Sequence, residues 1–139
     1  VKSTFNEKGL LLEKRPAQKM ARLIINLQNN PDLAQPLSVV CAALGIGADF
    51  RGLQTLKIKE TDRLLALKIE LAKVGVVLKT TDNSLSFEAT EIHPPTEAFK
   101  TYEDHRMAMS FALLASQFSI EIKNPEVVSK SYPDFFLEV

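Results

Sequence analysis

Charged residues are concentrated in three short segments of the chain: KIKETDR at 57–63, EDHR at 103–106 and SKSYPD at 129–134. Apolar residues follow each segment, so each lies at a predicted helix start. A helix N-terminus offers unpaired N–H groups and about half a positive charge, which attracts anions. Cations there oppose the helix dipole at a cost of roughly a few tenths of a kcal/mol each. Repetition of this cost at Lys59, Arg63 and Arg106 predicts an anionic ligand between them.

The same segments contain residues that could bind the anion and move a proton. Arginine binds carboxylate or phosphate through a bidentate fork, whereas lysine acts as a mobile point charge. Lys130 adds a cation in the third segment. Glu60 and His105 are suitable proton carriers beside a bound anion. The pattern indicates an anion site and leaves the reaction open.

A purely structural interpretation of these charges stays open at this stage. Acidic residues in a first helical turn are commonly caps, and mixed Lys, Glu and Arg commonly form a solvated face. We expect Asp62 to be a cap. A lone histidine such as His105 is more often a hydrogen-bonded structural residue than a catalyst. Taken one at a time, the three segments favour this interpretation.

Hydrophobic periodicity predicts the elements that position the charged segments. Helices are expected over residues 33–45, 60–74 and 104–117, and the third begins with a capping-box pattern, Thr101-x-x-Asp104. Hairpins are expected from residues 1–5 with 9–13 and from 76–80 with 84–90. Single strands are expected within 48–58 and 119–123. Residues 17–29 fit either a helix or a buried strand.

Four aspartates at predicted helix starts reveal a structural repeat. Asp32, Asp62, Asp104 and Asp134 are separated by 30, 42 and 30 residues. The intervals imply the order helix–strand–helix–strand–strand, with a period of 72 residues (104 minus 32). Such an order predicts an α/β or α+β fold with a mixed sheet.

Composition excludes several classes of function. The chain has 17 basic and 17 acidic residues and a formal net charge of zero, which argues against broad nucleic-acid or membrane binding. The sequence has no apolar run of the ~20 residues that span a membrane. Its one cysteine, Cys41, cannot form an internal disulfide, so we expect a reducing cytoplasm. Phosphate-loop and metal-binding motifs are absent, and His93 is interpreted as structural.

Four motifs resemble the 5-enolpyruvylshikimate-3-phosphate synthase family: NNPDLAQPL (29–37), LKIKETDRLLAL (56–67), YEDHRMAMSFAL (102–113) and VVSKSYPDFF (127–136). The resemblance implies an α/β fold of six βαβαββ units in two lobes, an inside-out barrel with helices packed inside. It favours a strand at 23–27. It also implies that residues 1–139 are the C-terminal portion of one lobe, about two repeat units, without the N-terminal lobe.

The resemblance further implies a reaction. The family transfers the enolpyruvyl group of phosphoenolpyruvate to the 5-hydroxyl of shikimate 3-phosphate and releases phosphate. It uses no metal or cofactor. We accordingly expect a cytoplasmic enzyme that is a monomer at full length, with these two small molecules as partners and no activity in the 139-residue chain alone.

Roles follow from the resemblance, motif by motif. Asp32 resembles the base and a ligand of the substrate hydroxyl, and Glu60 resembles the acid that protonates the methylene carbon of phosphoenolpyruvate. His105 resembles an auxiliary residue near Glu60. Shikimate 3-phosphate would contact Asp32, Lys59 and Thr55. The phosphate and carboxylate of phosphoenolpyruvate would lie among Arg63, Arg106 and Lys130.

One departure and two alternatives accompany this prediction. Pro36 stands where the family usually has threonine, so the helix start could shift toward Pro36 and re-aim Asp32. A UDP-N-acetylglucosamine enolpyruvyl transferase is the alternative enzyme, although its reactive cysteine has no counterpart here, because Cys41 lies in an apolar helix. A catalytically silent anion-binding module is the alternative from another class.

Overall fold

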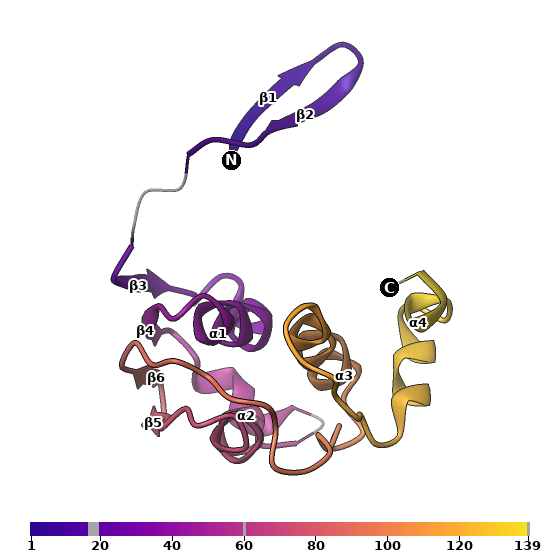
Figure 1. Ribbon diagram of the computed structural model, residues 1–139. Helices are drawn as coiled ribbons and strands as arrows, with labels where there is room; N and C mark the ends of the chain where they lie inside the picture. The colour runs from indigo at the N-terminus through magenta and orange to yellow at the C-terminus, as the bar shows by residue number, and fades with distance from the viewer. Residues whose placement is uncertain (17–19, 60, 139) are drawn as a thin grey trace.

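The computed structural model describes residues 1–16, 20–59 and 61–138 (Figure 1). The chain begins with a hairpin of β1 (Lys2–Asn6) and β2 (Gly9–Glu13), which pair antiparallel as predicted. Gly9 closes the turn with a φ of 125°, a value that L side chains rarely adopt. The hairpin projects from the rest of the molecule, and the Phe5 side chain is 81% exposed.

A four-stranded mixed sheet with two helices forms the body of the molecule. In chain order its elements are β3 (Arg22–Asn26), α1 (Ala34–Ala43), β4 (Gly47–Arg51), α2 (Arg63–Ala72), β5 (Lys79–Thr80) and β6 (Ser84–Phe87). The strand order is β3-β4-β6-β5, with β3 and β4 parallel and the other pairs antiparallel. The order βαβαββ and the mixed sheet are those expected. Within the ambiguous segment 17–29, the strand favoured at 23–27 is present as β3, whereas residues 17–19 fall outside the described part.

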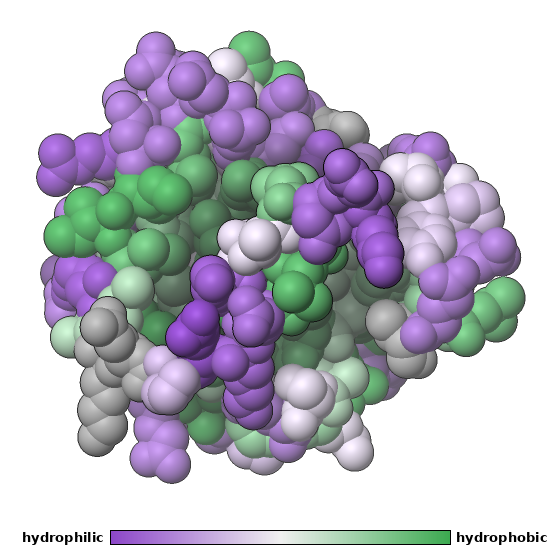
Figure 2. Space-filling view, turned by 90° about the horizontal axis from the view of Figure 1, so that it is seen from above, coloured by the Kyte–Doolittle hydropathy of each residue, from purple (hydrophilic) through white to green (hydrophobic). Residues whose placement is uncertain are grey.

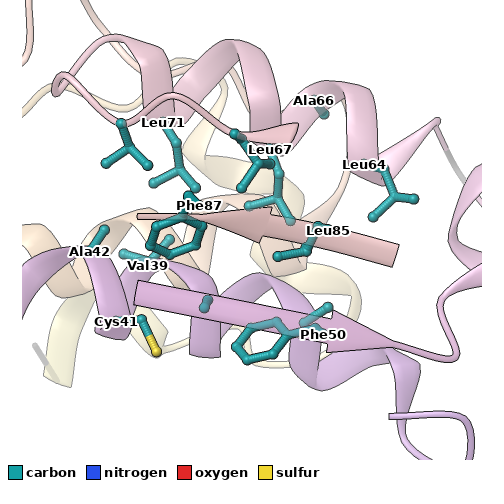
Figure 3. Packing of buried hydrophobic residues seen from close by; sticks show 14 of the residues in the cluster. Val39, Cys41, Ala42, Phe50, Leu64, Ala66, Leu67, Leu71, Leu85 and Phe87 are labelled. Carbon is teal, nitrogen blue, oxygen red and sulfur yellow. The ribbon is translucent and has the colours of Figure 1, made fainter. Parts of the chain in front are cut away.

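The helices cover one face of this sheet, and the core lies between them (Figures 1 and 3). Side chains alternate along the strands, so the cross-strand pairs Phe50–Leu85 and Ala48–Phe87 all point into the core. The predicted apolar stripe is buried in the same core: Leu64, Leu67 and Leu71 lie on α2, and Val74 follows its end. Burial of each large apolar side chain contributes about 1.5–3 kcal/mol to folding. This packing fixes α2, and with it Arg63.

The remaining chain packs a third helix against α1. A parallel bridge joins Phe99 to Ile122, and between them lie α3 (His105–Ala112) and a 3₁₀ helix, η3 (Leu113–Ser116). Phe99 stacks on Phe111 of α3 with ring centroids 4.5 Å apart. The C-terminal segment comprises η4 (Pro125–Lys130) and α4 (Phe135–Glu138), and η4 contacts α3.

Several predicted boundaries were wrong. α2 begins at Arg63 rather than residue 60, because the Asp62 side chain caps it by accepting from the amides of Leu64 and Leu65. Lys59 therefore precedes the helix and does not share a helical face with Arg63. Of residues 48–58, only the first four belong to a strand; Gln54–Ile58 form a 3₁₀ turn, η2. Residues 119–123 form only the bridge at Ile122.

The start of α3 also differs from the predicted capping box. Asp104 itself is the N-cap, and its carboxylate accepts from the Arg106 amide at 2.9 Å. Thr101 lies one turn earlier, and its buried hydroxyl has no hydrogen-bond partner among the described residues. The helix is α-helical only as far as Ala112, after which η3 continues it.

The described residues contain neither a membrane-spanning helix nor a cluster of metal-ligating side chains. No helix in this part of the chain is long and apolar enough to cross a membrane. Within the same residues, no three His, Cys, Asp or Glu side chains gather closely enough to hold a metal ion.

Candidate functional site

A buried ion pair between Arg63 and Asp104 lies at the centre of the candidate site. The Arg63 side chain is 2% exposed and the Asp104 side chain is fully buried. Arg63 donates from Nε to Asp104 Oδ2 at 2.7 Å and from Nη2 to Oδ1 at 3.3 Å, a bidentate geometry. The two residues begin different helices, α2 and α3. A buried charge that loses its partner destabilises a protein strongly, so this pair fixes the two helix starts against each other.

Asp32 extends the pair toward the surface. It lies in a 3₁₀ turn, η1 (Pro31–Leu33), immediately before α1. Its Oδ1 accepts from Arg63 Nη1 at 2.8 Å, and its Oδ2 lies 3.1 Å from Arg106 Nη2. The Asp32 side chain is 32% exposed and the Arg106 side chain 39%. Three predicted site residues, Asp32, Arg63 and Arg106, are thus in direct contact, and the outer two are accessible to a ligand.

Asp104 organises the inner end of this network. Besides Arg63 and the Arg106 amide, it accepts from Gln35 Nε2 at 3.2 Å. Gln35 is fully buried in α1, so one carboxylate joins the starts of α1, α2 and α3. Four N–H donors surround its two oxygens, which leaves the carboxylate well satisfied despite its burial.

Two further predicted residues lie at the start of α3. His105 Nδ1 is 4.0 Å from Asp104 Oδ1, and the imidazole is 19% exposed. Lys130, at the end of η4, directs its ammonium to the backbone carbonyl of Glu103 at 3.5 Å. The C-terminal segment therefore brings an exposed cation to the helix start that already carries Arg106.

The other predicted residues precede α2. Thr55 is exposed on η2, which packs next to η1 and hence near Asp32. Lys59 is exposed and ends η2 with an extended backbone. Lys57, on the same turn, instead pairs with Asp82, whose hydrogen bond raises the pKa of Lys57. Glu60 lies outside the described residues, so its role stays a prediction.

Pro36 lies in the first turn of α1. Residues Pro31–Leu33 form the 3₁₀ turn η1, and α1 begins at Ala34, one residue after the expected start and two residues before Pro36. A proline within the first turn is tolerated because its missing N–H is one of those without a helical partner. Asp32 is directed at Arg63 and Arg106.

A groove of about 840 Å³ runs along α3 beside these cations. Its walls come from Pro36 of α1, from α3 and η3, and from Tyr132 and Phe135 of the C-terminal segment; His105 and Arg106 also line it. Most of the lining is apolar. Figure 2, seen from above, shows hydrophobic residues exposed in recesses between hydrophilic ones. Its guanidinium and imidazole, those of Arg106 and His105, lie at the start of α3, whereas Ser110, Ser116, Ser131 and Tyr132 place hydroxyl groups elsewhere in the lining.

Two residues of the network were not predicted as site residues. Asp104 was interpreted only as part of a cap, although it opens the DHRMAM motif. Gln35 was not predicted, although a glutamine two residues into an apolar helix is compatible with a buried polar contact. Their partners are 41 and 69 residues away in sequence, so local spacing could not reveal these contacts.

Comparison with known proteins gives a consistent result. A family model described as EPSP synthase (3-phosphoshikimate 1-carboxyvinyltransferase) matches residues 4–139. A 3-phosphoshikimate 1-carboxyvinyltransferase of Bacteroides fragilis is 45% identical over 139 residues, 98% of this chain and 34% of that protein. Another, from Paraburkholderia phytofirmans, is 36% identical over 107 residues, 76% of this chain and 25% of that protein.

A solved structure agrees with these sequence matches. EPSP synthase from Acinetobacter baumannii superposes with a TM-score of 0.61 and 25% identity, covering 73% of this chain and 24% of that one. The chain thus spans about a third of the length of the Bacteroides relative, which it matches over 34%. The match over residues 4–139 and the shared fold place this chain in the EPSP synthase (3-phosphoshikimate 1-carboxyvinyltransferase) family.

Proposed function

We propose that the chain supplies the phosphoenolpyruvate-binding part of a 3-phosphoshikimate 1-carboxyvinyltransferase. The complete protein would transfer the enolpyruvyl group to the 5-hydroxyl of shikimate 3-phosphate and release phosphate. Residues 1–139 would form the C-terminal portion of one lobe of that protein. The observation that carries the proposal is the contact of Asp32 with both Arg63 and Arg106 beside the exposed Lys130.

The burial of the cations suggests a division of roles. Arg63 is 2% exposed and holds Asp32 and Asp104 in place. Arg106 and Lys130 are accessible at one helix start, where an anion would also meet the α3 dipole. We assign the phosphate and carboxylate of phosphoenolpyruvate chiefly to these two side chains. Direct contact from Arg63, as the family resemblance implies, remains part of the proposal.

The proposed chemistry depends mainly on how the side chains position the two substrates. Two anionic substrates repel each other, and fixed cations neutralise that repulsion and orient them. Asp32, fixed between two guanidinium groups, would accept the hydrogen bond of the attacking hydroxyl and take its proton. Glu60 would protonate the methylene carbon, and His105 would lie beside it. Shikimate 3-phosphate would also contact Lys59 and Thr55.

The alternative enzyme is less well supported. A UDP-N-acetylglucosamine enolpyruvyl transferase would need a reactive cysteine. Cys41 is 3% exposed in the core face of α1, and burial raises the pKa of its thiol. A buried thiol in apolar surroundings is a poor nucleophile.

We further propose that the complete protein is a cytoplasmic monomer.

An assay of phosphate release tests the proposal. Phosphate release from the two substrates is measured for the complete protein that carries this chain, both unmodified and with the substitution Arg106→Ala. Loss of one charged hydrogen bond, worth about 1.5–3 kcal/mol, should raise the KM for phosphoenolpyruvate at least about tenfold. Arg51→Ala is the matched control, because Arg51 is 69% exposed on β4 and pairs with Asp49, which is not one of the proposed site residues. A folded complete protein that releases no phosphate would favour the silent module instead.

A further inference from the structure

The turn immediately before α3 has an unusual backbone. Tyr102 and Glu103 both have left-handed conformations, with φ values of 54° and 56°. The Asp104 amide closes the turn onto the Thr101 carbonyl at 2.9 Å. Residues other than glycine rarely adopt this conformation, and two in succession persist only where the surroundings hold them. The turn ends at Asp104, the residue on which the buried network depends.

Glu70 holds this turn from both sides of Thr101. Its side chain is fully buried in α2. Oε2 accepts from the Lys100 amide at 3.0 Å, and Oε1 accepts from the Tyr102 hydroxyl at 2.8 Å. Burial, and then the hydrogen bond to Glu70, raises the pKa of Tyr102, so the phenol stays protonated and able to donate. One carboxylate therefore anchors both Lys100, the residue after the Phe99 bridge, and Tyr102, the first left-handed residue.

Lys73 compensates the negative charge of the buried Glu70 carboxylate. Its ammonium lies 2.6 Å from Glu70 Oε2 and donates to the Ala98 carbonyl at 2.7 Å, and its side chain is only 7% exposed. The pair is thus charge-balanced and also bound to the segment that leads into the turn. Removal of Glu70 would leave the Lys73 charge buried, which makes Glu70 itself a poor residue to mutate.

One helix contacts both ends of the turn. Glu70 and Arg63 are seven residues apart on α2, about two helical turns, and both side chains are buried. Glu70 accepts hydrogen bonds from Lys100 and Tyr102, which precede Asp104. Arg63 donates a hydrogen bond to Asp104 itself. Because α2 is rigid, the two contacts together set the place of the Asp104 carboxylate and of the α3 start.

We propose that Glu70 is a positioning residue of the anion site, acting through Tyr102 and the left-handed turn to place Asp104, Arg63 and Arg106. The benefit for phosphoenolpyruvate rests on the proposed function. The positioning itself does not, since it concerns contacts within the chain.

Tyr102→Phe tests the proposal because it removes one hydroxyl and keeps the ring. Nuclear magnetic resonance of the 139-residue chain would follow hydrogen exchange at the Arg106 amide and the Arg63 Nε–H. Both exchange rates should rise at least about tenfold, since a hydrogen bond to a charged group is lost. Tyr132→Phe is the matched control: it is the other tyrosine of the chain, and it also donates to a carboxylate, that of Glu138. Equal exchange in the two variants would overturn the proposal.

A second, rescue variant distinguishes an effect of the left-handed turn from a general loss of stability. Glycine adopts left-handed φ without strain, so Glu103→Gly added to Tyr102→Phe should restore most of the exchange protection. Continued fast exchange in the double variant would overturn the role of the turn.

Phosphoenolpyruvate titrations of the same proteins distinguish the two proposals. If the unmodified chain binds none, the proposed function loses support, while the exchange rates still decide the role of Glu70. If it binds, Tyr102→Phe should weaken the affinity several-fold relative to the unmodified chain. An unchanged affinity in Tyr102→Phe would contradict the link from the turn to the site.

Discussion

The substitution Asp104→Asn tests the buried network most sharply. The Asp104 carboxylate is fully buried and meets four donors: Arg63 Nε at 2.7 Å, Arg63 Nη2 at 3.3 Å, Gln35 Nε2 at 3.2 Å and the Arg106 amide at 2.9 Å. Asparagine keeps one acceptor oxygen and replaces the other with an NH₂ group. That group would face N–H donors and could not accept from them. The charge opposite a guanidinium that is 2% exposed would also be lost.

The expected loss can be estimated from these contacts. Breaking a buried ion pair by removing one partner costs about 3–5 kcal/mol. Asp32 still contacts Arg63 in the variant and retains part of the pairing, so we expect about 3 kcal/mol. The N-cap itself contributes little to the difference, because asparagine caps helices about as well as aspartate.

Asp62→Asn provides a matched control. Asp62 caps α2 in the same way, but its Oδ1 alone accepts from both amides and its side chain is partly exposed. Asparagine preserves this geometry, so only the charge at the helix end is lost, about 0.3–1 kcal/mol. Urea unfolding of both variants, followed by circular dichroism, should show Asp104→Asn to be less stable by at least about 2 kcal/mol. A difference below about 1 kcal/mol, with unchanged m-values, would refute the buried network as a determinant of stability.

Three further predictions follow from single side chains. Because the pKa of Tyr102 is raised in the folded state, its contribution to stability is complete below about pH 10 and is lost as the pH rises further. Tyr102→Phe should reduce this loss when the free energy of unfolding is measured against pH. The same pH dependence in the variant and the unmodified chain would contradict the prediction. Ser38→Ala should stabilise the chain by about 1 kcal/mol, because the buried hydroxyl has no partner among the described residues; a loss of stability in thermal unfolding would point to an unseen contact. Gly52→Ala should cost at least about 2 kcal/mol, because φ is +76° and the new Cβ would lie 2.5 Å from the Gln28 amide nitrogen; a smaller loss in urea unfolding would mean that this loop moves freely.

Sequence patterns predicted the elements better than their ends. The leucine stripe from Leu64 to Val74 identified α2, because apolar periodicity reflects the buried face directly. The charged segment led to a predicted start at residue 60, whereas the Asp62 cap fixes the start of α2 at Arg63. At the next helix, Thr101 and Asp104 matched the capping box, but the left-handed turn held by Glu70 overrides that local preference.

The proximity of several charged residues was predictable from the sequence, whereas their arrangement was not. Mixed charge at helix starts predicted a cluster that includes Arg63 and Arg106, and both do contact Asp32. The burial of Arg63 was not predictable, because a mixed-charge segment usually faces solvent and its partner Asp104 follows 41 residues later. The contact of Lys130 with Glu103 likewise depends on packing of the C-terminal segment against α3.

In the proposed function, phosphoenolpyruvate binds at the start of α3 through Arg106. Calorimetric titration of the 139-residue chain with phosphoenolpyruvate tests it most directly, with Arg106→Ala and the control Arg51→Ala measured alongside. We expect binding that added salt weakens, a Kd raised at least about tenfold by Arg106→Ala, and a Kd left unchanged by Arg51→Ala. No binding by the unmodified chain, or equal binding by the two variants, would contradict it.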